Sequence, residues 1–342
     1  MRVDAGIHPR VKSATHLQDY MGSPWKTRRL PGSDSYLYPP PRSIADSTNP
    51  SEVGRVLFAE GGLDRAILIP CTRGLLPDPE HGSIVASATN EWIAQEWLAN
   101  NEYAERYLGT IRVCPSDPPR AVEEIHRWAG HAGFVQIGVP LRGHIPYGSP
   151  VYYPIWEAAM AHNLPVVVHE DGGQGIELPP TMVGFPTTYE EYYATLPYAA
   201  GAHLASLIGE GTFERCPSLR FVWADGGFAG VFAALWRLDK DWRSARVEAP
   251  WVSKPPSAYL GKHVWFVLHG LDRTREPADL AHLFEIFGAS DRVMFGSNFP
   301  EWDAWGGLNS RDFSEDVFNR VMGLNAERLY DLARPTSKAR RT

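Results

Sequence analysis

The chain alternates short apolar runs, rich in β-branched residues, with longer amphipathic stretches. The short runs predict eight strands, at residues 2–7, 65–69, 107–113, 133–139, 165–169, 219–224, 263–269 and 292–296. Each run is followed by a stretch of helical periodicity, at residues 52–61, 84–100, 119–129, 154–162, 202–213, 228–241, 277–287 and 313–322. Repeated strand–helix units of this kind predict a parallel sheet.

Eight strands, each followed by a helix, predict a single α/β domain, a (β/α)8 TIM barrel that spans residues 1–342. The alternative is an open doubly wound sheet, but no strand is followed by a GxGxxG turn. Two connections are unusually long, residues 10–49 after the first strand and 172–199 after the fifth. Both leave carboxyl ends of strands, where barrel enzymes build their active sites, so we expect lid-like insertions. Residues 334–342 are expected to form a frayed tail.

Aromatic residues are frequent in these two connections. We expect Trp25, Phe185, Tyr189 and Tyr193 to contact an apolar substrate. The alternative is that they only pack the connections onto the barrel.

Composition narrows the class of partner. The formal net charge of −7 argues against nucleic acid, because polyanions bind clustered cationic surface. The apolar runs are far shorter than the ~20 residues of a membrane span, and no signal-peptide pattern opens the chain, so we expect a cytoplasmic protein without membrane contact. Three cysteines without CxxC spacing indicate neither a disulfide framework nor a thiolate zinc site. Twelve tryptophans make exposed aromatic surface and a homodimer the expectation.

Polar residues gather at the predicted carboxyl ends of the strands. They are His8, His169, Glu170, Asp171, Asp225, His269, Ser297, Asn298 and Glu301. A single isolated histidine is usually a hydrogen-bonded structural residue. Several imidazoles and carboxylates at one rim instead favour an active site for a small molecule.

Several motifs occur in order along the chain. They are VDAGIHP at residues 3–9, AHLASLI at 202–208, GTFER at 211–215, WADGGFA at 223–229, WRLD at 236–239, PPSAYL at 255–260 and FGSNFPEWD at 295–303. Together they resemble amidohydrolase family 2, the branch of the amidohydrolase superfamily with aminocarboxymuconate semialdehyde decarboxylase and the resorcylate decarboxylases. The resemblance covers nearly the whole chain and implies the barrel fold.

The resemblance also implies a divalent metal, usually zinc, but the chain departs from the family at the metal site. Members usually carry an acidic residue or a histidine where this chain has Gly6, and an aspartate where it has Asn298. His8 and His169 keep their ligand positions, and Glu301 stands where a histidine is usual. Two neutral imidazoles without a carboxylate fall short of the usual zinc ligand set. We therefore expect no metal cofactor; if zinc is present, the expected ligands are His8, His169 and Asn298.

The first functional hypothesis is a metal-independent lyase or cyclase that uses acid/base chemistry at the barrel mouth. It would cyclise, dehydrate, isomerise or cleave a C–C bond of an apolar or aromatic carbonyl compound. The predicted catalytic residues are Asp225 as base, His169 and His8 as donors or orienting groups, and Glu301 and His269 in second rank. Glu170 and Asn298 are predicted to contact the substrate. For Asp225, a cap on the helix that begins near residue 228 is an equal alternative.

Two other functions stay open at this point. One is a zinc-dependent decarboxylase or hydrolase with altered ligands. The other is a catalytically inactive barrel that binds a ligand or serves as a partner subunit. Metal analysis separates the first hypothesis from the second, and ligand screening with mutation of the rim separates it from the third.

Overall fold

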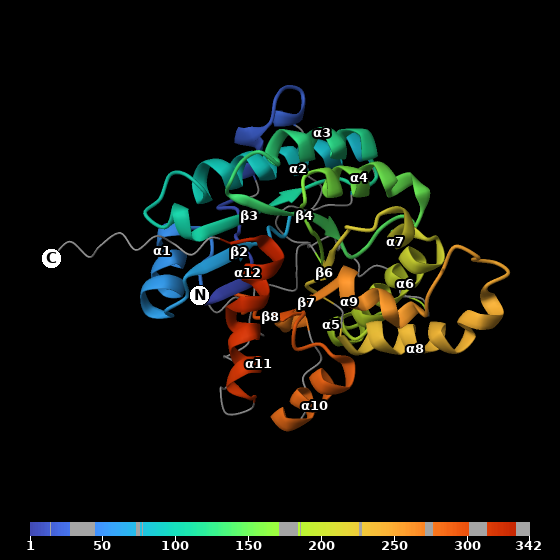
Figure 1. Cartoon of the computed structure of the whole chain (residues 1–342). Helices are drawn as coiled ribbons and strands as arrows, with labels where there is room; N and C mark the ends of the chain where they lie inside the picture. The colour runs from blue at the N-terminus through green and yellow to red at the C-terminus, as the bar shows by residue number, and fades with distance from the viewer. Residues whose placement is uncertain are drawn as a thin grey trace.

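The structure is a computed structural model that describes residues 1–13, 15–27, 45–72, 76, 78–170, 184, 186–225, 228–270, 276–300 and 313–332. Eight parallel strands pair in chain order, and helices surround them (Figure 1). The strands are β1 (Val3–Ile7), β2 (Arg65–Leu68), β3 (Tyr107–Arg112), β4 (Phe134–Pro140), β5 (Val166–His169), β6 (Phe221–Trp223), β7 (Val264–Val267) and β8 (Val293–Met294). The predicted barrel class is confirmed.

Backbone hydrogen bonds join β1 to the segment that follows β8 and nearly close the ring. The Ala5 amide donates to the Phe295 carbonyl at 2.7 Å, and the His8 amide donates to the Phe299 carbonyl at 2.8 Å. Asp4 adds a side-chain link, because its Oδ1 accepts from the amides of Gly6 and Ser297, both at 3.1 Å. The carboxyl ends of β1 and β8 are thereby held side by side.

The helices follow the predicted order, with several predicted segments divided in two. The α-helices are α1 (Pro50–Gly54), α2 (Pro79–Trp92), α3 (Pro118–Trp128), α4 (Tyr153–Ala161), α5 (Tyr189–Tyr193), α6 (Leu196–Gly209), α7 (Thr212–Arg215), α8 (Phe228–Ala245), α9 (Leu260–His263), α10 (Pro277–Phe287), α11 (Glu315–Asn319) and α12 (Asn325–Tyr330). The π-helical segments η3 (Arg55–Glu60), η4 (Ile93–Trp97) and η9 (Arg320–Leu324) continue α1, α2 and α11. Asn49 and Asp78 cap α1 and α2, each with proline at the next position, which is the residue order that starts helices.

Two apolar cores lie on the two faces of the sheet. Residues such as Ile67, Val167 and Val222 form the smaller core inside the barrel, while their neighbours along each strand pack against the helices. In β1 this alternation changes phase. Ala5 belongs to the inner core and Ile7 to the outer one, and the pairing of β1 with β2 shifts register between Asp4 and Ile7. This irregularity points Gly6 and His8 into the barrel mouth.

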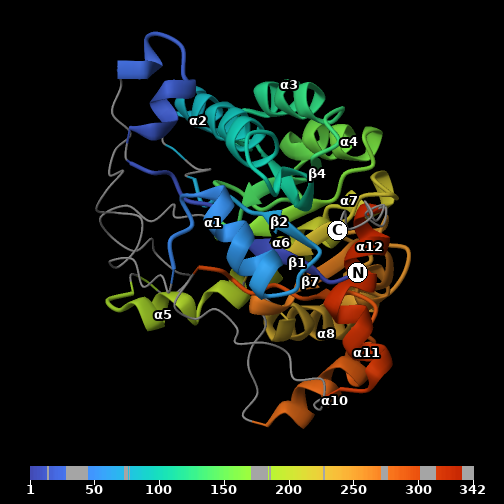
Figure 2. The same ribbon diagram turned by 90° about the vertical axis from the view of Figure 1, so that its left-hand side faces the viewer.

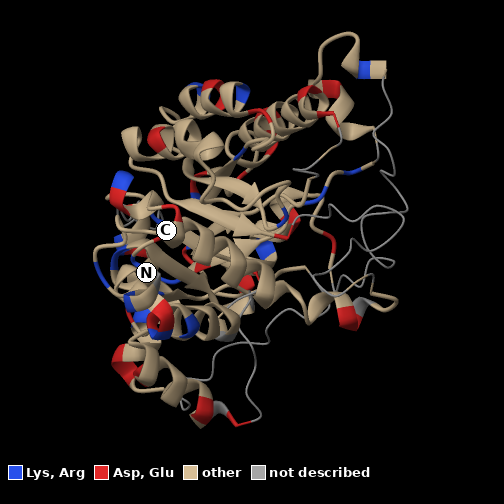
Figure 3. Cartoon of the chain, turned by 90° about the vertical axis from the view of Figure 1, so that its right-hand side faces the viewer, with Lys and Arg blue, Asp and Glu red and all other residues tan. Residues whose placement is uncertain are grey.

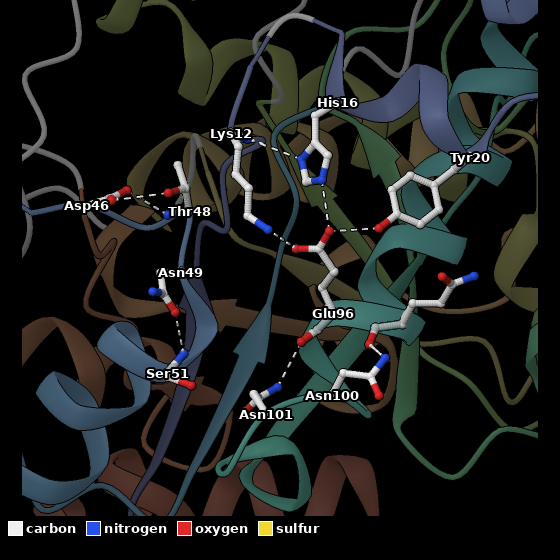
Figure 4. A network of polar contacts seen from close by, with 11 residues as sticks. Lys12, His16, Tyr20, Asp46, Thr48, Asn49, Ser51, Glu96, Asn100 and Asn101 are labelled. Carbon is white, nitrogen blue, oxygen red and sulfur yellow. Dashed lines mark hydrogen bonds and ion pairs between the residues drawn. The ribbon is translucent and has the colours of Figure 1, made fainter.

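The first long connection is anchored on the outside of the barrel. Glu96 of η4 accepts hydrogen bonds from Lys12 Nζ at 2.8 Å, His16 Nε2 at 2.9 Å and Tyr20 Oη at 2.8 Å (Figure 4). The 3-10 helices η1 (His16–Tyr20) and η2 (Trp25–Thr27) lie in this segment. Residue 14 and residues 28–44 of the predicted lid lie outside the described residues.

The second long connection contains a helix that the sequence pattern did not predict. Helix α5 begins with a capping box in which Thr188 and Glu191 exchange hydrogen bonds with each other's backbone. Figure 2 places α5 on the same side of the barrel as the start of the first connection, drawn in the darkest blue. The rest of that predicted lid, residues 172–183 and 185, and the predicted tail, 334–342, lie outside the described residues.

One strand boundary differs from prediction in a way that matters for the site. β7 ends at Val267, so His269 lies in the short 3-10 helix η8 (Leu268–Gly270) and not on the strand. The backbone turns before the rim, and pairing with β8 stops at Met294.

The charge distribution on the surface and the length of the helices bear on which kinds of partner the protein can contact. Basic and acidic residues are interspersed over the helices in the view of Figure 3. Within the described ranges, no helix has both the length and the apolar character to cross a bilayer.

Candidate active site

Five of the predicted rim residues meet at the mouth of the barrel. His8 follows β1, His169 ends β5, Asp225 follows β6, and His269 and Asn298 follow β7 and β8. All five side chains are buried or nearly so. The ring centroid of His8 lies 4.6 Å from that of His169 and 5.7 Å from that of His269, and the last two are 6.1 Å apart.

His8 has a defined tautomer. Its Nδ1 lies 3.0 Å from the Ile69 carbonyl oxygen, which can only accept, so Nδ1 carries a proton. The other ring nitrogen, Nε2, faces Asn298 Oδ1 at 2.7 Å. Nε2 either carries a second ring proton and donates to Oδ1, or accepts from the NH₂ of a turned side-chain amide, or lies with Oδ1 against a cation. A histidine whose N–H donates to a backbone carbonyl while its other nitrogen points into a cleft is typical of metal ligands.

Asp225 joins two strands and contacts two imidazoles. Its Oδ2 accepts from the Glu170 amide at 2.8 Å and lies 3.1 Å from His169 Nε2. Its Oδ1 lies 3.9 Å from His269 Nε2. The hydrogen bond from the Glu170 amide therefore joins the end of β5 to the end of β6. The capping alternative would be tested by the contacts of residues 226 and 227, which lie outside the described residues.

The His269 side chain is buried, with Asp225 Oδ1 3.9 Å from its Nε2. Neither ring nitrogen has a hydrogen-bond partner among the described residues, and His169 Nδ1 also lacks one there. Burial lowers the pKa of both His169 and His269 well below the ordinary value, with a further contribution from the neighbouring His8. Buried polar atoms left unpaired are costly, so they indicate a ligand or ion that pairs with them.

The arrangement can accommodate a divalent metal. Ligand atoms of His169, Asp225 and His269 all lie within 4.8 Å of one another, and those of His8, Cys71 and His169 do so as well. Two imidazoles and one carboxylate, with a position open to substrate, form a common catalytic metal site. The residues therefore fit the cofactor, through a set that keeps the expected ligand His169 and adds Asp225 and His269, which were predicted as catalytic residues.

Some residues of the mouth were not singled out from the sequence. Cys71 follows β2 and lies beside His8 and His169. Arg112 ends β3 and is almost fully buried, and its charge contributes to the low pKa of His169. Asp4 is buried below the rim, and burial raises its pKa to about 6. Arg112 and Asp4 are charged residues within apolar strands, which is the signal that could have identified them.

A second polar group borders the mouth on the β4–β5 side. Arg142 Nε lies 3.7 Å from Glu170 Oε2 and donates to Tyr192 Oη at 3.1 Å. The guanidinium also stacks on the Tyr192 ring, 4.7 Å from its centroid. Burial raises the pKa of Glu170, while Tyr192 and Arg142 oppose that shift. Glu170, predicted to contact substrate, is thus part of an ion-paired group.

The predicted lid aromatics lie elsewhere or cannot be placed. Trp25 stacks on His81 of α2, with 5.2 Å between ring centroids, so its described ring contact is with a helix. Tyr193 is partly buried and packs on the outer core. The side chain of Tyr189, together with Phe185, Asp171 and Glu301, lies outside the described residues.

Comparison with known proteins agrees with the fold and the motifs. A model of the amidohydrolase family, amidohydrolase 2, matches residues 76–332. The chain therefore belongs to this family.

Individual relatives and solved structures give the comparison more detail. The chain is 25% identical over 270 residues to 2-amino-3-carboxymuconate-6-semialdehyde decarboxylase of Dictyostelium discoideum, covering 75% of this chain and 69% of that protein. The crystal structure of an amidohydrolase from Mycobacterium avium subsp. paratuberculosis superposes with a TM-score of 0.75 at 18% identity, over 98% of this chain and 99% of that one. Dihydroxybenzoic acid decarboxylase from Polaromonas sp. JS666, solved with manganese and 2-nitroresorcinol, gives 0.68 at 18% identity and covers 97% of both chains.

Proposed function

We propose that this protein is a metal-dependent lyase that removes carbon dioxide from a small aromatic or conjugated carboxylic acid at the barrel mouth. The observation that carries the proposal is the proximity of two imidazoles and one carboxylate, from His169, His269 and Asp225. The decarboxylase relative and the manganese-containing structure support it. It replaces the metal-independent hypothesis, because His269 and Asp225 supply the nitrogen and the charge that Gly6 and Asn298 lack.

These three residues would hold the metal, and His8 would lie beside it. A divalent cation bound there supplies Lewis-acid stabilisation of the negative charge that develops as the C–C bond breaks. His8 Nδ1 is held by the Ile69 carbonyl, so Nε2 is the ring atom available for proton transfer. We assign to His8 Nε2 the donation of the proton that replaces the carboxyl group on the product carbon. The carboxyl group leaves as carbon dioxide, and solvent then restores the proton on Nε2.

Some of the remaining predicted residues keep their roles within this proposal. Arg142 and Tyr192 fix Glu170 beside the mouth, so that Glu170 limits where a substrate can lie. Asn298 contacts the substrate or His8 Nε2. Phe185 and Tyr189 are the proposed substrate contacts from the second long connection, and Glu301, which follows β8, is a further proposed contact. Trp25 and Tyr193 are left out of the proposal, because their described contacts are with α2 and with the outer core.

The test compares metal-free and metal-loaded protein. Chelator-treated protein is reconstituted with Mn²⁺, Zn²⁺ or Co²⁺ and assayed for carbon dioxide release from a panel of hydroxybenzoic acids and carboxymuconate-type dienoic acids. The proposal predicts release only from loaded protein and loss of bound metal in His169→Ala. His131→Ala, at an exposed histidine, is the matched control.

Two results contradict the proposal. Turnover that survives chelation would return the metal-independent hypothesis to first place. Tight binding of a metal and of aromatic acids, with no turnover of any acid in the panel, would favour a binding barrel.

A further inference from the structure

We infer that Gly6 and Gly296 form a slot for the His269 imidazole, and that this two-glycine slot positions His269 as a metal ligand. The inference rests on the proposed function, since it concerns the ligand set of that site. It assigns a role to two residues that carry no side-chain chemistry of their own.

The slot is defined by the space that the two glycines leave open. A Cβ atom at position 6 would lie 2.6 Å from His269 Cε1 and 3.0 Å from its Nδ1. A Cβ atom at position 296 would lie 2.7 Å from the same Nδ1 and 2.3 Å from Val267 Cγ1. Side-chain atoms essentially never approach so closely, so any larger residue at either position would displace the imidazole.

The slot also orients the ring. Because the Nδ1–Cε1 edge of His269 lies against the two glycines, the opposite edge, with Nε2, faces Asp225 Oδ1 at 3.9 Å. The ring meets His8 edge-on, at an interplanar angle of 83°. Nε2 is therefore the atom that joins the ligand group of His169 and Asp225.

The fold explains why position 6 faces His269 at all. The register shift between Asp4 and Ile7 turns Gly6 inward. The backbone N–H of Asn298 donates to the Gly6 carbonyl at 3.2 Å, and this bond holds β1 next to the segment after β8. A side chain at position 6 and the His269 ring therefore compete for one volume. In this barrel the imidazole from η8 occupies it, so β1 contributes only His8 at the rim.

The test is a double-mutant cycle read by metal binding, independently of turnover. Co²⁺ is titrated into chelator-treated wild type, Gly6→Ala, His269→Ala and the double variant, with affinity from calorimetry and ligand field from visible absorption. Gly6→Ala should weaken Co²⁺ binding by about 10- to 100-fold, the range for loss of a group that orients a metal ligand. In the His269→Ala background the same glycine change should cost nothing further, and the Co²⁺ spectra of His269→Ala and the double variant should coincide.

Gly109→Ala is the matched control. Gly109 is a buried strand residue of β3 whose Cβ would lie 2.7 Å from a Phe134 ring atom, remote from the mouth. It should lower the melting temperature without changing Co²⁺ affinity. If Gly6→Ala alone does not fold, recovery of a folded barrel in the double variant measures the same competition for space.

The outcomes are distinguishable from those of the proposed function. Wild type that binds Co²⁺ while Gly6→Ala binds it equally well overturns the slot alone. An equal loss from Gly6→Ala with and without the imidazole also overturns it, because the effect then does not act through His269. Wild type that binds no Co²⁺ overturns the proposed function and the slot together.

Discussion

The two sides of the barrel mouth differ in how their polar groups are paired. On the β4–β6 side, several described polar groups are paired: His203 of α6 accepts from the Tyr147 amide at 3.1 Å and donates to the Leu141 carbonyl at 2.8 Å, and Arg142 pairs with Glu170, although His169 Nδ1 and Trp223 Nε1 have no hydrogen-bond partner among the described residues. On the β7–β1 side, both nitrogens of His269 lack a hydrogen-bond partner within the described ranges, and glycines line the ring. The paired side is built as a rigid support, and the unpaired side is where a ligand gains most by binding.

Asp225 links the two sides, so its replacement has the largest expected effect. In Asp225→Asn the remaining carbonyl oxygen can still accept from the Glu170 amide, but the negative charge between His169 and His269 is lost. We expect carbon dioxide release to fall by about 10²- to 10⁴-fold, the range for removal of a group that acts in the chemical step. Initial rates with elemental analysis check this.

The metal content of this variant separates two roles. Loss of metal together with activity identifies Asp225 as a ligand, whereas loss of activity with metal retained identifies it as the base. Activity close to wild type would contradict both.

His203 tests the paired side through pH. Burial lowers its pKa to about 4, against an ordinary value of 6.5. Above pH 6.5, His203 is unprotonated in both the folded and the unfolded chain. Between pH 6.5 and 4, the unfolded chain binds a proton at His203 that the folded barrel does not bind. The folded state therefore loses stability as the pH falls through this window. The full loss is about 3 kcal/mol.

The measurement is urea unfolding at pH 7 and pH 4.5. Wild type should lose more free energy of unfolding between the two than His203→Gln, which cannot take up the proton. His131→Gln, at an exposed position, is the control and should follow wild type. Parallel curves for wild type and His203→Gln would contradict the assignment.

Arg142 gives a smaller effect on the same side. Arg142→Ala leaves the buried Glu170 carboxylate without its cation and removes the stack on Tyr192. Because the Arg142 side chain is 23% exposed and the ion pair is 3.7 Å long, we expect a loss of only about 1–2 kcal/mol in unfolding free energy. Co²⁺ affinity should change little, and a loss of metal here would show that the two sides are not independent.

Glu96 lies outside the mouth, and its replacement has the smallest expected effect on the free energy of unfolding. Glu96→Gln removes the ion pair with Lys12 while leaving an acceptor for Tyr20 (Figure 4). The carboxylate is partly exposed, so unfolding free energy should fall by less than about 1 kcal/mol. Thermal melting measures this change; a larger loss would mean that the first connection is integral to the barrel.

Much of the architecture could be predicted because it follows from local patterns. Apolar runs located all eight strands to within about two residues, and helical periodicity located most of the surrounding helices, but not α9 or α12. Helix α5 was missed because five residues are too few for a periodic signal, and its capping box lies in a segment dense in tyrosine. Those runs also brought His8, His169 and Asp225 to one rim, since parallel strands end at the same edge of a barrel.

The proposed ligand set was not visible in the same way. From the sequence, Gly6 and Asn298 indicated that the site had lost its acidic ligands and its metal, because each position was assessed by its own side chain alone. The barrel shows that the space at Gly6 is filled from another element by His269, and that Asp225 lies beside it. Compensation of this kind joins residues more than 250 positions apart, so no window along the chain contains it.

The hydrophobic period and the spacing of the strand and helix segments were therefore sufficient to predict the barrel class and the rim on which polar residues gather. Both depend on interactions between near neighbours in sequence. Packing across the barrel decided which of those residues meet. A register irregularity in β1 turned Gly6 and His8 inward, and a 3-10 turn after Val267 aimed His269 at the space that Gly6 leaves. The physical reason is that exclusion of one atom's volume by another acts only at contact distance, and contact exists only after the chain has closed on itself.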